Sequence, residues 1–431
     1  VDGSNTLLSA SGGRLAFGAP ADFSGEVNLP GIVALGTGGV TLSAARWDMV
    51  DSSFTDGSAW SRSLAATIAS AIRGMVQDGA GNRYVYGAFA GNINLGPGAN
   101  LTSGTGSAEG DLAGFAVKFD GAGKLLWARA FPVVNYAPNS VSGESLVDIT
   151  DAGIDAAGNL YLCGTLRAQA SFGGITRTPN GPSDGFVASL DGSGGLRWFQ
   201  GLGAEGHETL ADMEVAPSGS SIAVGGRQAS LYEQEGYGSH WDGNGYAARL
   251  NGSGTVTASW SLQGDPAGNW TWTESESFET GFFETWVSHV CLCGDGVLVR
   301  WTKVTEGEWP ESPVLRRLGG TEWHIGGPVY VTSMASDASG NAFVIEPQIA
   351  LDEEITNISK ITKYSASDGS NLWSRAGRYV WDDVNLRVAE ASDLREVKPE
   401  AGGGALLVWG DGWATELGGS AENESRVVVE R

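Results

Sequence analysis

Residues 114–127 read Gly-Phe-Ala-Val-Lys-Phe-Asp-Gly-Ala-Gly-Lys-Leu-Leu-Trp, and residues 185–198 repeat the phrase as Gly-Phe-Val-Ala-Ser-Leu-Asp-Gly-Ser-Gly-Gly-Leu-Arg-Trp. Each copy has an alternating apolar run, a tetrad rich in Asp and Gly, and a second apolar run that ends in Trp. Period-two alternation broken by a glycine-containing turn predicts a β-hairpin, because glycine readily adopts the positive φ that such a turn needs.

A second phrase precedes both copies. It has the form Asp-x-x-Gly-Asn followed by an aromatic-rich apolar run, and it occurs at residues 78–87, 155–164 and 337–344. A strand leads into this turn and another leads out, which predicts a second hairpin. Two hairpins in series give four antiparallel strands per repeat unit.

Degenerate copies of the two phrases extend over the rest of the chain. We count seven units, at approximately 1–47, 72–131, 146–202, 208–262, 283–320, 328–377 and 388–431. Four-stranded units repeated radially are the blades of a β-propeller. The predicted fold is therefore all-β, a single seven-bladed β-propeller of four-stranded antiparallel blades over residues 1–431. Stacked β-sandwich domains are the alternative, and they explain the even spacing of the hairpins less well.

Composition agrees with a turn-rich β protein. The chain has 66 Gly and only 18% charged residues, and its one helix-like stretch, residues 63–74, is expected to be a short connector. The net charge of −24 favours solubility and opposes binding to nucleic acid and to anionic lipid. No apolar run reaches the length that spans a bilayer, so no membrane insertion is expected.

The compartment is inferred from the scarce lysine, the abundant turns and the acidic charge, and the chain start agrees with it. Three cysteines, an odd number, argue against a disulfide scaffold. The chain begins at Val1 rather than Met, which fits a processed protein. Together with scarce lysine and the acidic charge, this leads us to expect an extracytoplasmic protein that is secreted, periplasmic or on the cell surface.

The two phrases resemble the bacterial seven-bladed β-propeller repeat known as SBBP. Its members carry Asp-x-x-Gly-Asn-x-Tyr-Val-x-Gly, then Gly-x-Asp-Ala-Phe-Val-x-Lys-Leu-Asp, then Gly-x-Leu-x-Trp. Close matches lie at 78–87 with 114–127 and at 155–164 with 184–198; partial matches lie at 337–344 and 358–373. The resemblance implies a secreted or surface-exposed bacterial protein and supplies no catalytic residue.

One phrase is similar to a different family. Residues 367–373, Ser-Asp-Gly-Ser-Asn-Leu-Trp, resemble the ends of blades in quinoprotein-like propellers. Quinoprotein enzymes also use two adjacent cysteines near the cofactor. Here Leu292 separates Cys291 from Cys293, so that feature is absent.

Two groups of residues could bind a metal. His289, Cys291 and Cys293 alternate on an expected strand, so they share one face and could bind a soft metal; equally, they could be buried core residues. The Asp-Gly-x-Gly and Asp-x-x-Gly-Asn turns could bind calcium, but each supplies one carboxylate. We interpret that Asp as an acceptor of backbone hydrogen bonds in the turn. No metal and no cofactor is predicted.

The region 232–324 is unusually rich in aromatic residues, and residues 263–286 interrupt the repeat as an insertion. Exposed aromatic side chains form sugar platforms or hot spots for protein partners, although they could also cover the edge of a blade. The predicted ligand- or partner-binding residues are Trp241, Trp270, Trp272, Phe282, Phe283 and Trp286.

The last unit, 388–431, ends without an obvious fourth strand. Residues 1–8 could supply it and close the ring, or they could be the innermost strand of the first unit. The second arrangement leaves an open edge, which a subunit or another chain could cover by strand addition.

No catalytic arrangement stands out, because none of the four histidines lies beside a nucleophile signature. We therefore expect a non-enzymatic scaffold or interaction module with a protein partner or a second copy of itself. A carbohydrate-binding, lectin-like propeller is the first alternative. A quinoprotein-like or polysaccharide-active enzyme is the second.

Overall fold

The computed structural model is all-β, and no helix occurs among the residues it describes. Before residue 64 it places only the backbone of six short strands. After that it describes residues 64, 66–96, 99–104, 112–135, 145–234, 238–262, 283–305, 311–325, 329–346, 349–351, 354–357, 360–376, 379–382, 387–399, 405–411 and 426–430. Contacts divide the chain into a first unit, residues 1–210 with 217–219, and a second unit, residues 211–216 with 220–431.

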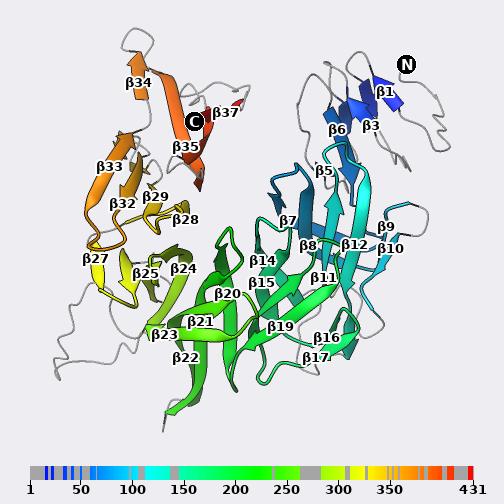
Figure 1. The fold of residues 1–431 in the computed structure, drawn as a ribbon, viewed down its shortest axis with the longest axis horizontal. Helices are drawn as coiled ribbons and strands as arrows, with labels where there is room; N and C mark the ends of the chain where they lie inside the picture. Colours follow the sequence, from blue (N-terminus) through cyan, green and yellow to red (C-terminus); the bar gives the residue numbers. More distant parts are fainter. Residues whose placement is uncertain are drawn as a thin grey trace. The chain divides into compact units, whose positions relative to one another are not determined.

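Six four-stranded antiparallel sheets follow one another along the chain, and in each the strands are neighbours in chain order (Figure 1). Two sheets lie in the first unit. Their strands are β7 (Ala69–Gln77), β8 (Arg83–Ala90), β11 (Ala113–Phe119) and β12 (Leu125–Phe131), then β14 (Val147–Ile154), β15 (Leu160–Leu166), β18 (Asp184–Leu190) and β19 (Leu196–Leu202).

The third sheet begins at the boundary of the units, and the next three belong to the second unit. Their strands are β20 (His207–Val215), β21 (Ser221–Gln234), β22 (Gly238–Asn251) and β23 (Val256–Leu262); β24 (Phe283–Cys293), β25 (Gly296–Thr305), β26 (Glu311–Leu318) and β27 (Trp323–Ile325); β28 (Ser333–Ser336), β29 (Ala342–Glu346), β32 (Lys360–Tyr364) and β33 (Asn371–Ala376); and β34 (Tyr379–Asp382), β35 (Arg387–Pro399), β36 (Ala405–Asp411) and β37 (Arg426–Glu430).

Small hairpins emerge between the second and third strands of three sheets, which the repeat did not predict. They are β9 (Asn92–Asn94) with β10 (Asn100–Thr102), β16 (Gln169–Phe172) with β17 (Ile175–Arg177), and β30 (Ile349–Leu351) with β31 (Glu354–Asn357). A further strand, β13 (Val133–Asn135), pairs with β16.

The start of the chain departs from the predicted blade at 1–47. Its strands are β1 (Leu15–Phe17), β2 (Ala21–Phe23), β3 (Val33–Leu35), β4 (Val40–Leu42), β5 (Met49–Val50) and β6 (Ala59–Ser63). They form a sheet of order β1-β3-β6-β5, in which β1 and β3 are parallel, and a separate parallel pair β2–β4. A parallel pair needs a crossover, and the 18–32 connection is long enough for one. The expected antiparallel blade is therefore wrong here.

Two other local predictions are wrong. The helix-like stretch 63–74 contains the start of β7, which pairs with β8 through a bulge between Ile72 and Gly74. Tertiary pairing outweighs the weak helical spacing. The last sheet is not short of a strand, because β34 pairs with β35 just before the predicted start at residue 388. Residues 1–8, the other candidate for that strand, lie outside the described residues.

The repeated turns explain how each hairpin closes. In Asp155-x-x-Gly158-Asn159, the carboxylate of Asp155 accepts hydrogen bonds from the backbone N–H groups of Ala157 (3.0 Å) and Asn159 (2.9 Å). Gly158 has a φ of 78°, the left-handed conformation that glycine tolerates best. The same hydrogen bonds recur at Asp78 and Asp337, so the prediction of a structural Asp is confirmed at these turns.

The repeated Trp connects successive sheets. Trp127, at the centre of β12, donates from Nε1 to the carbonyl of Gly192 (3.0 Å), which lies in the β18–β19 turn of the next sheet. In the second unit Trp323 donates to the carbonyl of Ala366 (3.3 Å), in the β32–β33 turn. The Trp127–Gly192 hydrogen bond thus joins successive copies of the same phrase, 114–127 and 185–198, across neighbouring sheets.

The central strands of the first two sheets are covered on both faces. Every residue of β8, β11, β15 and β18 is buried.

Candidate functional site

The six aromatic residues predicted to bind a ligand or partner are described unequally. Trp270, Trp272 and Phe282 lie outside the described residues, and the side chains of Trp241 and Phe283 do as well, although their backbones lie on β22 and β24. Trp286, on β24, has a described side chain, and 43% of its surface is exposed. The structure thus examines one of the six.

Trp286 is an exception on its strand. Its neighbours Thr285 and Val287 are buried, as are the residues from Val290 to Cys293. Burying an indole removes a large apolar area from water, so a Trp left exposed beside a well-packed strand marks a surface suited to contact with another molecule. Trp286 has the largest side chain on β24.

Arg300, on the neighbouring strand β25, organises the same end of β24. A bulge between Val287 and His289 leaves Ser288 unpaired, and Arg300 donates to the Ser288 hydroxyl at 2.7 Å. Its Nε donates to the carbonyl of Val329 at 3.3 Å. Burial lowers the pKa of Arg300, and the nearby Tyr330 opposes that shift.

Tyr330 follows Val329 and is 40% exposed. Arg300 therefore joins the strand end that carries Trp286 to the segment that carries Tyr330. We call the group of Trp286, Arg300 and Tyr330 the Trp286 surface, because Arg300 connects the two backbone segments that carry the exposed aromatic residues. It contains two exposed aromatic rings and a guanidinium held by two hydrogen bonds.

Two acidic side chains of β20 bind the backbone of β24 deeper in the second unit. The N–H of Val290 donates to Asp212 Oδ2 and the N–H of Leu292 donates to Glu214 Oε2, both at 2.6 Å. Glu214 also accepts from Ser336 at the end of β28, from the backbone N–H (2.6 Å) and from the hydroxyl (2.8 Å). These carboxylates satisfy backbone donors along the edge of β24 that has no strand partner.

Burial gives Glu214 an unusual protonation equilibrium. Although the residue as a whole is only half-buried, desolvation of its carboxyl group raises the pKa of Glu214 to about 7, while the hydrogen bonds from Ser336 and Leu292 act in the opposite direction. Glu214 is not among the site residues predicted from the sequence. A usable signal is the Asp-x-Glu spacing at 212–214, which puts two acids on one face of a strand that is expected to be internal.

The possible soft-metal residues are buried beside this carboxylate. Cys291 and Cys293 have no exposed surface, and burial raises the pKa of Cys291 well above its usual value and that of Cys293 to about 11. Burial, with Arg300 nearby, lowers the pKa of His289 to about 4, so this imidazole is neutral. Within the described ranges no group of three or more His, Cys, Asp or Glu side chains is placed to hold a metal ion.

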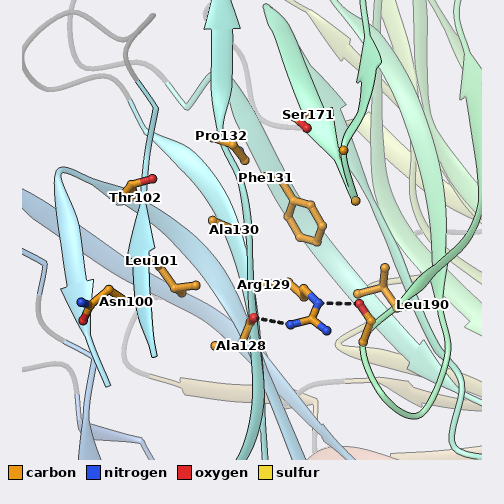
Figure 2. Close-up of a pocket in the computed structure, with 13 residues that line it drawn as sticks. Asn100, Leu101, Thr102, Ala128, Arg129, Ala130, Phe131, Pro132, Ser171 and Leu190 are labelled. Carbon is orange, nitrogen blue, oxygen red and sulfur yellow. Dashed lines mark hydrogen bonds between the residues drawn. The ribbon is translucent and has the colours of Figure 1, made fainter. Parts of the chain in front are cut away.

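A groove in the first unit runs along β12, and Figure 2 shows its lining. Its volume is about 350 Å³, and it is bordered by β10 on one side and by the β16–β17 turn on the other. Arg129 lines it but is fully engaged, since it donates to the carbonyls of Gly194 (2.7 Å), Ala128 (2.9 Å) and Ser193 (3.0 Å). Arg129 therefore holds the next sheet's turn in place and offers little to a ligand.

The parts of the chain that the structure describes contain no helix that is long and apolar enough to cross a membrane.

No known family matches the chain, and no curated protein does. Solved structures with a related backbone include quinohemoprotein alcohol dehydrogenases from Comamonas testosteroni (11% identity, 85% of this chain and 64% of that one, TM-score 0.37) and Pseudomonas putida HK5 (12%, 83% and 58%, 0.35). Another is the extracellular domain of a putative hybrid two-component system from B. thetaiotaomicron (11%, 84% and 38%, 0.27). The chain spans less than two thirds of each, and similarity this low carries no argument about function.

Proposed function

We propose that this chain is an extracytoplasmic β-propeller of the SBBP type, with six antiparallel blades and a seventh that contains the mixed sheet β1-β3-β6-β5, and that it binds a protein partner and has no enzymatic activity of its own. The observation that carries the binding role is the Trp286 surface. Trp286 protrudes from β24 between the buried residues Thr285 and Val287, and Arg300 connects the nearby Ser288 to the segment bearing Tyr330.

The propeller is supported by the order of the strands and by the contacts between sheets. Six sheets are meanders of four antiparallel strands. Within the second unit, β24 contacts β21 and β22 of the preceding sheet and β28 of the following one. In a β-propeller each sheet packs against the sheets before and after it, and the exposed edges of the sheets are short and protected.

The composition of the Trp286 surface favours a protein partner. Trp, Tyr and Arg are the residue types most enriched at the energetic centres of protein interfaces. The Arg300 guanidinium is already held in place, so little conformational entropy is lost when it binds a partner. Its contacts with the partner therefore contribute more to the affinity. The partner is another protein or a second copy of this chain.

The test is native mass spectrometry of the protein from its source, comparing wild type with Trp286→Ala/Tyr330→Ala. We expect wild type to carry a partner at fixed stoichiometry and the double variant to lose it. Trp373→Ala is the matched control, because Trp373 is 40% exposed and lies on β33, the last strand of the next sheet. Equal partner content in wild type and the double variant would refute the proposal.

Glycan binding is the second candidate, because the same exposed indole and phenol rings could stack on sugar faces. A glycan array separates the two: binding that Trp286→Ala abolishes, in protein that carries no partner, favours the lectin-like function. The enzyme alternative predicts a cofactor chromophore in the purified protein.

A further inference from the structure

The hairpin β16–β17, inserted between the second and third strands of the second sheet, carries an arginine that is not engaged. The guanidinium of Arg177, the last residue of β17, makes no hydrogen bond and no ion pair with any described residue, and its Nε is shielded from solvent. The other arginines on this sheet and hairpin are engaged: Arg167 donates to the Ser145 carbonyl and Arg197 to the Tyr161 and Ser189 hydroxyls. A shielded cation without an anionic partner needs an explanation in a chain of net charge −24.

A stack of aromatic rings positions this guanidinium. Arg177 lies over the ring of Phe199 at 5.2 Å from its centroid. Phe199 in turn contacts Phe172 (centroids 4.7 Å apart) and stacks on Phe186 (5.6 Å). Both of those rings are fully buried, so they give Phe199 a rigid support. Arginine stacked on an aromatic face keeps its planar fork of N–H donors available at the edge, where it fits a carboxylate.

Arg177 lines a cavity of about 310 Å³ together with Thr178, Asn180, Asp184, Phe199 and Gly201. Asp184 lines the same cavity but forms no ion pair with Arg177; its carboxylate accepts hydrogen bonds from Asn180 N–H (3.0 Å), Asn180 Nδ2 (3.1 Å) and Gly181 N–H (3.3 Å) instead. In this cavity the Arg177 guanidinium is therefore available to donate hydrogen bonds to a ligand, whereas both carboxylate oxygens of Asp184 already accept hydrogen bonds from the protein.

The remaining polar atoms suit hydroxyl groups. Thr178 accepts a hydrogen bond from Gln169 Nε2 (2.9 Å), which leaves its O–H free to donate. Asn180 uses its amide nitrogen on Asp184, and its carbonyl oxygen accepts from no described residue. Gly201 keeps the wall open, since a Cβ there would meet nothing closer than the Phe199 ring at 3.9 Å. The volume matches the lower end of small-ligand sites.

We propose that this cavity binds a hydroxylated carboxylate of the size of a single sugar, such as a uronic acid, with Arg177 paired to the carboxylate and Thr178 and Asn180 to the hydroxyls. Asp184 positions Asn180. The site is independent of the Trp286 surface, and its failure would leave the proposed partner binding unaffected.

The test is isothermal titration calorimetry of the whole chain with D-glucuronate, and with D-glucose as the neutral analogue. We expect one glucuronate site with a Kd of about 1 mM or tighter, and binding of glucose at least about tenfold weaker. Arg177→Gln should weaken glucuronate binding at least about tenfold, and Arg177→Lys should weaken it less, because lysine keeps the charge but loses the fork. Arg73→Gln is the control, since it removes the same charge from an exposed arginine that forms an ion pair with Asp148.

Circular dichroism melting of each variant confirms folding. Arg177 forms no hydrogen bond, so its replacement leaves no partner unsatisfied, and the lysine variant provides a second test. Glucuronate that does not bind wild type, or that binds Arg177→Gln and wild type equally, would overturn the proposal. A linear oligouronate that binds more tightly than glucuronate would identify the ligand as the end of an acidic polysaccharide, and equal affinity would identify a free sugar acid.

Discussion

The carboxylate of Glu214 accepts two hydrogen bonds from Ser336, 122 residues further along the chain, and a third from the N–H of Leu292. Glu214 lies on β20, Leu292 on β24 and Ser336 on β28, which are the first strands of three successive sheets. One carboxyl group therefore connects three strands of the repeat. Its protonation should affect the stability of the whole second unit.

Stability should fall as pH rises from about 4.5 to 7. The pKa of Glu214 is raised from 4.5 to about 7 by burial, so in this window the folded chain binds more protons than the unfolded chain. The contribution of Glu214 is then fully favourable below pH 4.5 and is lost as pH passes 7. Urea denaturation from pH 4.5 to 7.5 should show a slope of at most about 1.4 kcal/mol per pH unit from this group.

Glu214→Gln should remove that slope and lower stability at pH 5, because an amide nitrogen would face one of the N–H donors. Glu205→Gln, at an exposed position, should keep the wild-type slope. A slope unchanged in Glu214→Gln would show that another group titrates.

Asp155→Ala should destabilise the chain by about 1–3 kcal/mol, because the buried Asp155 carboxylate accepts hydrogen bonds from the N–H groups of Ala157 and Asn159 and from the buried Tyr161 hydroxyl. Burial acts to raise the pKa of Asp155, but hydrogen bonds from Asn159 and Tyr161 outweigh it and lower that pKa, so its contribution is present at neutral pH and lost in acid. Asp368→Ala, in the exposed β32–β33 turn, should cost less. Equal losses in urea denaturation would contradict this account.

Gly164→Ala should also be costly. Gly164, on β15, lies opposite the bulge that begins at Ile149 on β14, and a Cβ there would overlap the carbonyl oxygen of Asp148. Overpacking of this kind costs about 1–3 kcal/mol. Gly79→Ala, where a Cβ meets nothing within 4 Å, should change stability by less than about 0.5 kcal/mol. Thermal melting of the two variants makes the comparison, and a Gly164→Ala protein as stable as Gly79→Ala would show that the bulge tolerates a side chain.

The thiols should be unreactive in the native state. Cys163, Cys291 and Cys293 are all buried, and burial raises the pKa of the last two. Only thiolates react with DTNB, so the native protein at pH 8 should react slowly and the denatured protein should show three thiols at once. Rapid reaction of one native thiol would contradict this and would mean that its strand opens easily, β15 for Cys163 or β24 for Cys291 and Cys293.

The repeat predicted the hairpins because their causes are local. Gly158 and Asp155 adopt their turn through contacts within five residues, and the same phrase recurs where the structure shows the same turn. The parallel pairing of β1 with β3 was missed because strands of three residues are too short to show an alternating sequence pattern. The crossover between them has no sequence signature either. Glu214 and Arg177 were missed because their surroundings come from other strands. Glu214 binds Leu292 and Ser336 on other strands, and Arg177 packs on Phe199 without an acidic partner among the described residues, and neither arrangement is visible in the local sequence.

The central claim, that the Trp286 surface binds a protein, is tested most directly by the Kd of the partner recovered with the native protein. This Kd should be measured for wild type, Trp286→Ala and Trp373→Ala. We predict that Trp286→Ala weakens binding at least about tenfold and that Trp373→Ala stays within about twofold of wild type. Equal affinities for wild type and Trp286→Ala would contradict the claim.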